Sequence, residues 1–333
     1  MTVLITGAGG FLGGHLAETL RASGYAVRAL VQPGEDVTAL TETNADICYG
    51  DLDDRDSLER AVDRAELVLH CAAKTGPWGH YFDYHRINVE GTERLLNASL
   101  QAGVKRFIHV SSITVHGADV RGTATESSPL VSDGDPYTRT KLEAEQVLQQ
   151  RIAQENASVT IVRPGMIYGP RDSHTFGRIA RLIDGGRMVI IGSGRNQMPL
   201  IHVSDAARGI LLASEARHAV GRTYLLVNDE PTTQLDFLSR IAEELGAATP
   251  RFHIPYRPAL ALAGSVETAF RIMGSKQPPP VTRFGLKQFG GENRFIVDRA
   301  RHELGFVPKF GLEAGVRDSV AWFRTQALTT ALH

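Results

Sequence analysis

Continuous apolar runs alternate with helical patterns through the first half of the chain, and this alternation predicts a parallel sheet with helices between its strands. The expected strands are residues 3–5, 26–31, 47–49, 67–70, 107–110 and 159–162, and the expected helices are residues 12–23, 57–65, 84–103 and 137–154. We expect Asp56 or Ser57 to cap a helix N-terminus, and Gly24 and Gly103 to end helices. The predicted fold class is therefore α/β, a doubly wound parallel sheet, which binds ligands at the carboxyl ends of its strands.

The pattern changes after Pro164. Helical patterns at 174–184, 204–215, 234–245 and 258–273 are mixed with isolated strands, and residues 277–280 (Gln-Pro-Pro-Pro) read as a rigid connector. We expect a core formed by residues 1–164, with 197–228 returning to it. Residues 165–196 and 229–333 are then expected to form a smaller C-terminal lobe that binds substrate.

Charge and cysteine content narrow the class of protein. The 36 basic and 37 acidic residues give a net charge of −1, which argues against nucleic acid as a partner because a phosphate backbone rewards a basic excess. Cys48 and Cys71 are too few for a disulfide framework or a zinc cluster, and no metal-ligand spacing appears. We therefore expect no metal site. The chain enters an apolar strand at once without a signal-peptide pattern, so we expect a cytoplasmic protein.

One segment, residues 258–273, is apolar enough to suggest a membrane. It is too short to span a bilayer, and Glu267 and Arg271 interrupt it, so no integral membrane segment is expected. We interpret it as an amphipathic helix over an apolar pocket. A peripheral membrane contact is the alternative.

Three glycines follow the first expected strand and open the first helix. Gly7 suits the tight turn, Gly10 lets the backbone approach a pyrophosphate, and Gly13 lets helix and strand pack closely. The helix N-terminus at Phe11 and Leu12 then faces the phosphates. The spacing differs from the commoner Gly-x-Gly-x-x-Gly, and a mere tight turn is the alternative. Position favours a dinucleotide site on a Rossmann-type core.

Residues after the neighbouring strands extend this candidate cofactor site. Asp51 and Leu52 follow the third strand, where they would meet adenine, although Asp51 is equally suited to capping a helix. Ala72 and Ala73 follow the fourth strand and are small enough for a nucleotide to lie against the backbone, with Lys74 beside them.

The choice of cofactor depends on the end of the second strand. An acid there binds the ribose 2′-hydroxyl, and an arginine accepts a 2′-phosphate. Val31 provides no acid and Gln32 provides no base, but Arg28 is nearby in the sequence. NADP is therefore favoured over NAD.

Tyr137 and Lys141 lie one helical turn apart on the same face. The ammonium would favour the phenolate and lower the pKa of Tyr137 from its reference of about 10. An exposed helix pair is the alternative. Combined with the glycine turn, the pair indicates dinucleotide-dependent redox chemistry in which Tyr137 moves the proton.

These motifs together resemble the extended short-chain dehydrogenases/reductases, over nearly the whole chain. The resemblance implies that Ser112, at the end of the 107–110 strand, is the catalytic serine with Ser111 beside it. It also implies that Asn88 supports the active site, that Lys141 binds the nicotinamide ribose, and that Pro164 and Gly165 touch the nicotinamide. Tyr137 would donate a proton to a carbonyl oxygen while Ser112 hydrogen-bonds that oxygen.

Residues 163–170 resemble the 3β-hydroxysteroid dehydrogenase branch, and residues 72–79 resemble its bacterial members that reduce 2-alkyl-3-oxoalkanoic acids. The resemblance implies an apolar pocket with Trp78 as a wall and Lys74 meeting a carboxylate. Ser112, Met166 and Tyr168 complete the expected substrate contacts. A packed loop tryptophan and a solvated lysine are the alternatives.

Three functions remain open from the sequence. The first is an NAD(P)-dependent oxidoreductase that interconverts a secondary alcohol and a ketone on a small hydrophobic substrate. The second is a nucleotide-sugar epimerase or dehydratase, and the third is a non-catalytic dinucleotide-sensing protein. Members of the family commonly form homodimers through the 84–103 helix and the helix that carries Tyr137. Leu95, Leu96, Leu142, Val147 and Leu148 are the apolar residues expected at that interface.

Overall fold

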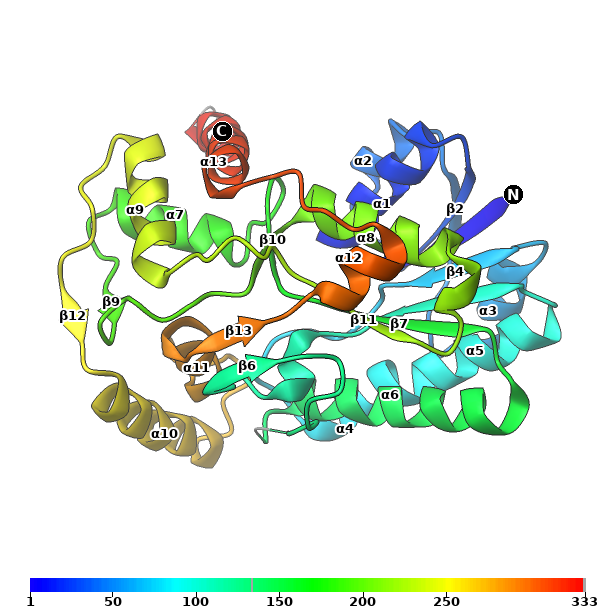
Figure 1. Ribbon diagram of the computed structural model, residues 1–333, viewed down its shortest axis with the longest axis horizontal. Coiled ribbons are helices and arrows are strands. Elements are labelled where there is room, and N and C mark those ends of the chain that lie inside the picture. Colours follow the sequence, from blue (N-terminus) through cyan, green and yellow to red (C-terminus); the bar gives the residue numbers. More distant parts are fainter. Residues whose placement is uncertain (133, 332–333) are drawn as a thin grey trace.

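Seven parallel strands form the central sheet in the computed structural model, which describes residues 1–132 and 134–331 (Figure 1). In spatial order the strands are β11 (Thr223–Leu226), β7 (Val159–Pro164), β5 (Arg106–Val110), β4 (Leu67–His70), β1 (Thr2–Thr6), β2 (Ala26–Val31) and β3 (Asp46–Tyr49). The strand order reverses between β1 and β4, where ligands bind in sheets of this kind. The predicted α/β class with a parallel doubly wound sheet is confirmed.

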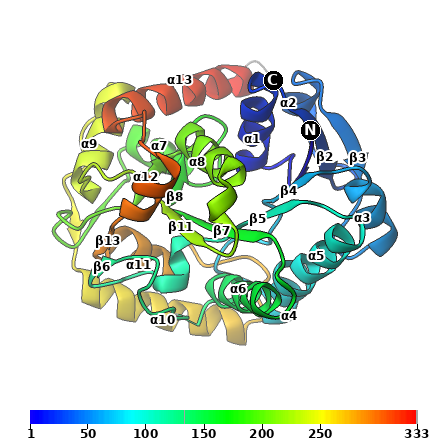
Figure 2. The same ribbon diagram turned by 45° about the vertical axis from the view of Figure 1, so that its right-hand side comes forward.

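Helices cover both faces of the sheet, as Figure 2 shows. One face is covered by α1 (Phe11–Ala22), α2 (Thr38–Thr41), α8 (Val203–Glu215) and α12 (Asp298–Leu304). The other face is covered by α3 (Arg55–Val62), α5 (Gly91–Gln101) and α6 (Pro136–Glu155). Strand side chains alternate between the two apolar clusters. Val3 and Ile5 belong to the first and Leu4 to the second, as the two-residue repeat of a strand requires.

A third apolar cluster lies outside the sheet and holds the C-terminal lobe together. Helices α7 (Phe176–Asp184), α9 (Gln234–Leu245) and α13 (Leu312–Ala331) pack there around Phe176 and Phe237. Short parallel pairs connect the lobe: β8 (Met166–Tyr168) with β10 (Leu200–His202), β9 (Ile190–Ile191) with β12 (His253–Ile254), and β6 (Gly122–Ala124) with β13 (Asn293–Phe295). Helices α10 (Tyr256–Ile272) and α11 (Arg283–Gly290) complete it.

The segment expected as one helix over 84–103 is divided. It begins earlier, as α4 (Tyr81–His85), passes through a π-helical turn at Arg86–Glu90, and continues as α5. Such turns often mark functional sites. The expected cap of α3 was also wrong: Asp54 caps it by accepting the Asp56 N–H, while the Ser57 hydroxyl bonds to backbone groups of Asp51 and Asp54.

The residues expected at a dimer interface are only partly available. Leu95, Leu96 and Leu148 are buried in the core of the single chain, so they are not free to contact a second copy. Leu142 and Val147 are partly exposed and could contact a second copy, so the homodimer stays a prediction. Among the described helices, none combines the length and the apolarity needed to cross a bilayer.

Candidate active site

The glycine turn after β1 is shaped for close contact with backbone on one side and for a ligand on the other. Gly7 has a φ of +66°, and a Cβ there would lie 2.8 Å from the Ala72 backbone. A Cβ on Gly13 would lie 2.1 Å from Gly7 O, so helix and strand touch at this point. Gly10, the N-cap of α1, offers no side chain to its N-terminus. The N–H groups at Phe11 and Leu12 are therefore available to an anion such as a pyrophosphate.

The residues expected beyond β3 and β4 flank this turn. Ala72 lies against Gly7, and its N–H donates to Thr6 Oγ1 at 3.3 Å. Ala73 follows it in the loop after β4. Asp51 is partly exposed at the end of β3 and accepts a hydrogen bond from Gln32 Nε2 at 2.6 Å. Leu52 is packed in the core beneath α5, so its side chain belongs to the apolar core and is not exposed for contact with adenine.

Arg28 is not brought to this edge of the sheet. Its side chain pairs with Asp46 at 2.9 Å and donates to the Ala61 and Asp63 carbonyls where α3 ends. Asp46 is the first residue of β3, whereas the glycine turn lies beyond the carboxyl ends of the strands. The guanidinium stabilises a helix C-terminus. The expectation that Arg28 helps to bind a 2′-phosphate is corrected accordingly.

Ser112 lies two residues beyond the end of β5, with its hydroxyl oriented by one neighbour. Thr114 donates to Ser112 Oγ from both its N–H (3.2 Å) and its hydroxyl (3.0 Å). A hydroxyl oxygen has two lone pairs and one proton to donate. Because both lone pairs are occupied, the Ser112 hydroxyl can form a further hydrogen bond only as a donor.

Tyr137 is the second residue of α6 and lies beside Ser112. Burial raises the pKa of Tyr137 to about 12; the Ser112 hydroxyl lowers it in part, and the Asp135 carboxylate raises it further. The sequence predicted the opposite, a pKa lowered by Lys141. That prediction is corrected, because removal of the phenol from water outweighs the hydrogen bond that would favour the phenolate. Tyr137 is thus a protonated phenol at neutral pH.

Lys141 is buried one turn further along α6, and its ammonium donates to Val110 O at 2.7 Å. Burial lowers the pKa of Lys141 to about 8, against a smaller raising effect from Cys71 and Glu145. The ammonium therefore bonds to the end of β5 rather than acting on the Tyr137 phenol. It places a positive charge beneath the reacting groups, at some cost in folding stability.

Replacing Lys141 with Met is expected to raise the melting temperature of the ligand-free protein at pH 7. The unfolded lysine has a pKa near 10.5 and the folded one near 8, so the unfolded state binds more protons between these values. Stability of the native protein then rises with pH across this window, as the folded lysine loses its charge. The advantage of Lys141→Met should be largest below pH 8 and shrink toward pH 10.5, measured by thermal melts at each pH. Lys105→Met, at an exposed lysine, is the control. A constant advantage at every pH would contradict the assignment.

Asn88 acts through the loop after β4 and not directly on the reacting groups. Its side-chain amide accepts from Lys74 N at 2.7 Å and donates to Lys74 O and to Thr140 Oγ1, both at 3.0 Å. It therefore clamps this loop to α6 next to Lys141. The π-helical turn carries Asn88, whose own carbonyl accepts from Thr92. Sequence reasoning assigned no role to Thr114 or Thr140. The small polar residues next to Ser112 and Lys141 were the only signal available.

The residues expected around the nicotinamide and the substrate divide into two groups. Pro164 ends β7, and a Cβ on Gly165 would lie 2.3 Å from Pro199 O, so this turn requires glycine. Met166 and Tyr168 are buried in the apolar cluster of the lobe, where the Tyr168 ring packs on Phe176 and Phe237. These two side chains are core residues, and the structure does not bring Tyr168 to Ser112. Their expected role in binding substrate is corrected.

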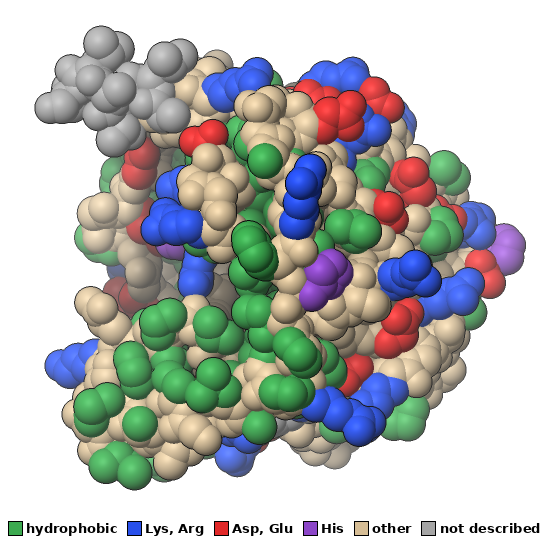
Figure 3. All heavy atoms as spheres, turned by 90° about the vertical axis from the view of Figure 1, so that its left-hand side faces the viewer, with side chains coloured by type: hydrophobic (Ala, Val, Ile, Leu, Met, Phe, Trp, Pro, Cys, Tyr) green, Lys and Arg blue, Asp and Glu red, His purple; other side chains and the backbone are tan. Residues whose placement is uncertain are grey.

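Trp78 connects the loop after β4 to the end of α10. Its indole N–H donates to Ser275 O at 3.1 Å, and its ring meets Phe270 edge-on. Lys74, from the same loop, lies over the ring of Tyr84. Helix α10 exposes Leu262, with Ile272 and Met273 at its end, and Figure 3 shows hydrophobic side chains gathered over this part of the surface. The border of the site on this side is apolar.

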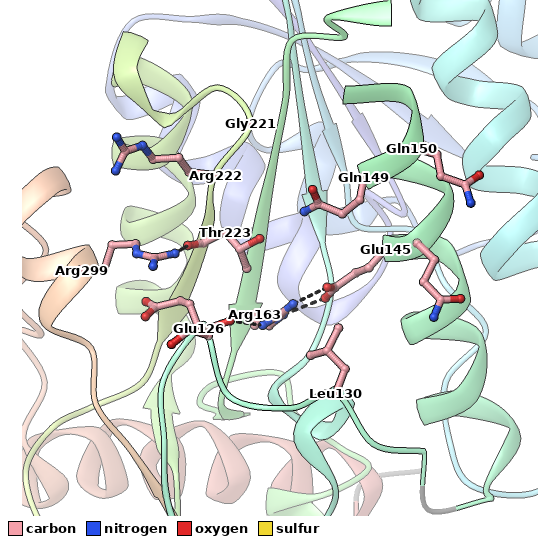
Figure 4. Close-up of a pocket in the computed structure, with 12 residues that line it drawn as sticks. Glu126, Leu130, Glu145, Gln149, Gln150, Arg163, Gly221, Arg222, Thr223 and Arg299 are labelled. Atoms are coloured by element: carbon pink, nitrogen blue, oxygen red, sulfur yellow. Dashed lines mark hydrogen bonds and ion pairs between the residues drawn. The ribbon is translucent and has the colours of Figure 1, made fainter. Parts of the chain in front are cut away.

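A hollow of about 850 Å³ opens elsewhere, between α6, β11 and α12 (Figure 4). Most residues that line it are polar or charged, and several are engaged with one another: Arg163 pairs with Glu145, and Arg299 donates to Thr223 O. It contains neither Ser112 nor Tyr137. We therefore place the candidate active site at the carboxyl edge of the sheet and not at this hollow.

Comparisons with known proteins show which family this chain is similar to. A model of the NAD dependent epimerase/dehydratase family matches residues 3–226. A 2-alkyl-3-oxoalkanoate reductase from Stenotrophomonas maltophilia is 31% identical over 327 residues, which are 95% of this chain and 98% of that protein. The human sterol-4-alpha-carboxylate 3-dehydrogenase (decarboxylating) is 29% identical over 331 residues, covering 96% of this chain and 87% of its own. The crystal structure of gox2253 matches with a TM-score of 0.83 at 31% identity, over 98% of both chains.

Proposed function

The chain belongs to the NAD dependent epimerase/dehydratase family, the extended short-chain dehydrogenases/reductases, and from this we propose that it reduces a ketone on a hydrophobic substrate to a secondary alcohol. Membership confirms the resemblance that the sequence motifs indicated. The observation that carries the proposal is the contact between a protonated Tyr137 phenol and a Ser112 hydroxyl whose oxygen already accepts two hydrogen bonds from Thr114.

Two neighbouring hydroxyl groups suit a carbonyl oxygen that binds beside them. Ser112 donates a hydrogen bond to that oxygen and stabilises the negative charge that develops on it. Tyr137 then transfers its proton to the same oxygen, which completes the alcohol. A bound nicotinamide cofactor supplies the hydride for the carbon. The Lys141 ammonium, fixed on Val110 O, adds a buried positive charge one turn along α6 from Tyr137.

The state of Tyr137 suits the reduction step. A general acid must hold its proton before that step, and a pKa of about 12 keeps the phenol protonated at neutral pH.

The substrate class rests on the apolar border and on the relatives. The exposed apolar side chains of α10 and the edge-on pair of Trp78 and Phe270 favour an aliphatic or sterol-like body. Two relatives are named for 2-alkyl-3-oxoalkanoate and for sterol-4-alpha-carboxylate, both of which carry a carboxylate near the reacting oxygen. We propose a β-keto acid or a related compound, and Lys74, on the loop that Asn88 clamps, is the candidate cation for its carboxylate.

The remaining assignments belong to the same proposal. Residues 1–164 with 197–228 would form the cofactor core, and 165–196 with 229–333 the substrate lobe. A homodimer through α5 and α6 stays a prediction. The cofactor is NAD or NADP, and the preference for NADP has lost the support of Arg28.

A turnover assay tests the proposal. The purified protein is mixed with NADH or NADPH and with hydrophobic ketones and β-keto acids, and loss of nicotinamide absorbance is followed. We expect turnover with at least one acyl or sterol-like ketone. A panel of nucleotide sugars serves as the opposing arm. Conversion of a sugar nucleotide by retained cofactor, without net redox change and without ketone turnover, would replace this proposal by an epimerase or dehydratase.

A further inference from the structure

The loop that follows β2 folds back toward the glycine turn. Pro33 and Gly34 form the two central residues of a β-turn that is closed by Glu35 N donating to Gln32 O at 3.2 Å. Gly34 has a φ of +88°, and proline followed by a glycine of positive φ is the signature of a type II turn. The turn fixes Glu35 immediately beyond the carboxyl end of β2.

The carboxylate of Glu35 lies between the end of β2 and the glycine turn. Its Oε2 accepts the Gln32 N–H at 3.1 Å, and a methyl group on Gly9 would lie 2.9 Å from this same oxygen. The side chain is exposed, and within the described part of the chain no hydrogen bond is made to Oε1. One carboxylate oxygen is thus fixed by the backbone while the other is free to accept a donor from a ligand.

Acidic groups surround this point. Asp36 follows directly, with its carboxylate bonded to Thr38, and Asp51 accepts from the Gln32 side chain on the neighbouring strand end. Across residues 1–132 and 134–331, no Lys or Arg forms an ion pair with Glu35, Asp36 or Asp51. Arg28, the base nearest in sequence on β2, is occupied at the opposite end of the strands. The edge is therefore suited to a hydroxyl donor and unsuited to a phosphate.

We infer that Glu35 accepts a hydrogen bond from the adenosine ribose of a bound dinucleotide and repels a 2′-phosphate, so that the protein selects NAD over NADP. This inference rests on the proposed function, since it names the cofactor of that site. In sheets of this kind the ribose lies beyond the second strand, where an acid bonds to its 2′-hydroxyl. From the sequence, that acid was expected at the end of the second strand, where Val31 stands instead. The turn brings Glu35, four residues further along, to this position. The inference therefore favours NAD in place of the NADP expected from the sequence.

Equilibrium binding tests this without catalysis. Dissociation constants of the full chain for NAD⁺ and NADP⁺ are measured by calorimetry, for the wild type and for Glu35→Gln. ADP and its 2′-phosphorylated form are then titrated to isolate the 2′-position. We expect the wild type to bind NAD⁺ at least tenfold more tightly than NADP⁺. Glu35→Gln should gain about tenfold for NADP⁺ by losing a like charge, and change its NAD⁺ affinity by less than about threefold because the amide oxygen still accepts.

Glu42→Gln is the matched control, since it removes an exposed acid further along the same connection. It should leave the ratio of the two dissociation constants unchanged. Equal affinities of the wild type for NAD⁺ and NADP⁺, or a Glu35→Gln ratio equal to that of the wild type, would overturn the inference while leaving the proposed reductase intact. Failure of both dinucleotides to bind would overturn the proposed function and this inference with it.

Discussion

Replacing Tyr137 with Phe is expected to lower kcat/KM for ketone reduction by about 10²- to 10⁴-fold, the range in which a general acid contributes. The phenylalanine keeps the packing of α6 against the sheet but removes the proton that the carbonyl oxygen needs. Ser112 does not replace it, because a serine hydroxyl is a far weaker acid than a phenol and its role here is to donate a hydrogen bond. Initial rates with saturating cofactor measure the loss.

Two readings separate lost chemistry from lost structure. The dissociation constant for the dinucleotide should stay within about threefold of the wild type, because the glycine turn is untouched. Tyr81→Phe is the matched variant: it removes a phenol from the neighbouring helix α4, where the hydroxyl donates to Glu143 outside the site. Its activity should remain within about twofold. Full ketone turnover by Tyr137→Phe would refute the assignment of the general acid.

Breaking the buried ion pair between Glu145 and Arg163 is expected to lower the free energy of unfolding by about 3–5 kcal/mol. Glu145 lies on α6 one turn beyond Lys141, and its carboxylate meets the Arg163 guanidinium of β7 through two contacts, one of 2.9 Å (Figure 4). Both side chains are buried, and Arg163 also bonds to His116 and Glu126 O. Glu145→Leu would leave the guanidinium charge buried without its partner. Urea unfolding measures the change.

A double variant distinguishes an unpaired charge from simple loss of packing. If the cost of Glu145→Leu comes from the stranded guanidinium, adding Arg163→Leu should recover a substantial part of it, since two apolar residues need no partners. Glu155→Gln, which removes an exposed partner of Arg151 from the same helix, should cost at most about 1 kcal/mol. Additive losses in the double variant would show that the pair contributes through packing alone.

The sequence predicted the buried parts of the fold closely and the solvent-facing details less well. Strands 26–31 and 67–70 and helix 234–245 have the predicted bounds, because each is an apolar or amphipathic run with polar or glycine boundaries. The break in the 84–103 helix was not predictable from periodicity, since a π-helical turn adds one residue to the repeat while the chain stays helical on both sides. The cap of α3 is Asp54 and not Asp56 or Ser57, because several acidic residues close together satisfy the capping pattern equally.

Within the site, the sequence indicated which residues meet but not how their environments act. Ser112 and Tyr137 lie in contact while Lys141 bonds to Val110 O, and the pKa of Tyr137 is raised because burial, which a motif does not report, outweighs the neighbouring hydroxyl. Met166 and Tyr168 follow a site residue in sequence but turn into the core of the lobe. Glu35 was missed because the search for an acid stopped at the last residue of the strand, while a turn returns the chain four residues later.

The place of β11 in the sheet has a consequence for how the protein is made. Its partner β7 ends at Pro164, but β11 begins only at Thr223, after α7 and α8 have been synthesised. Until then β7 is an unpaired edge of apolar backbone, the kind of surface on which nascent chains associate with one another. A nascent chain that ends between these two strands would therefore expose an unpaired strand edge that promotes association. A fragment cut at residue 164 would lack β11 and keep the same exposed edge.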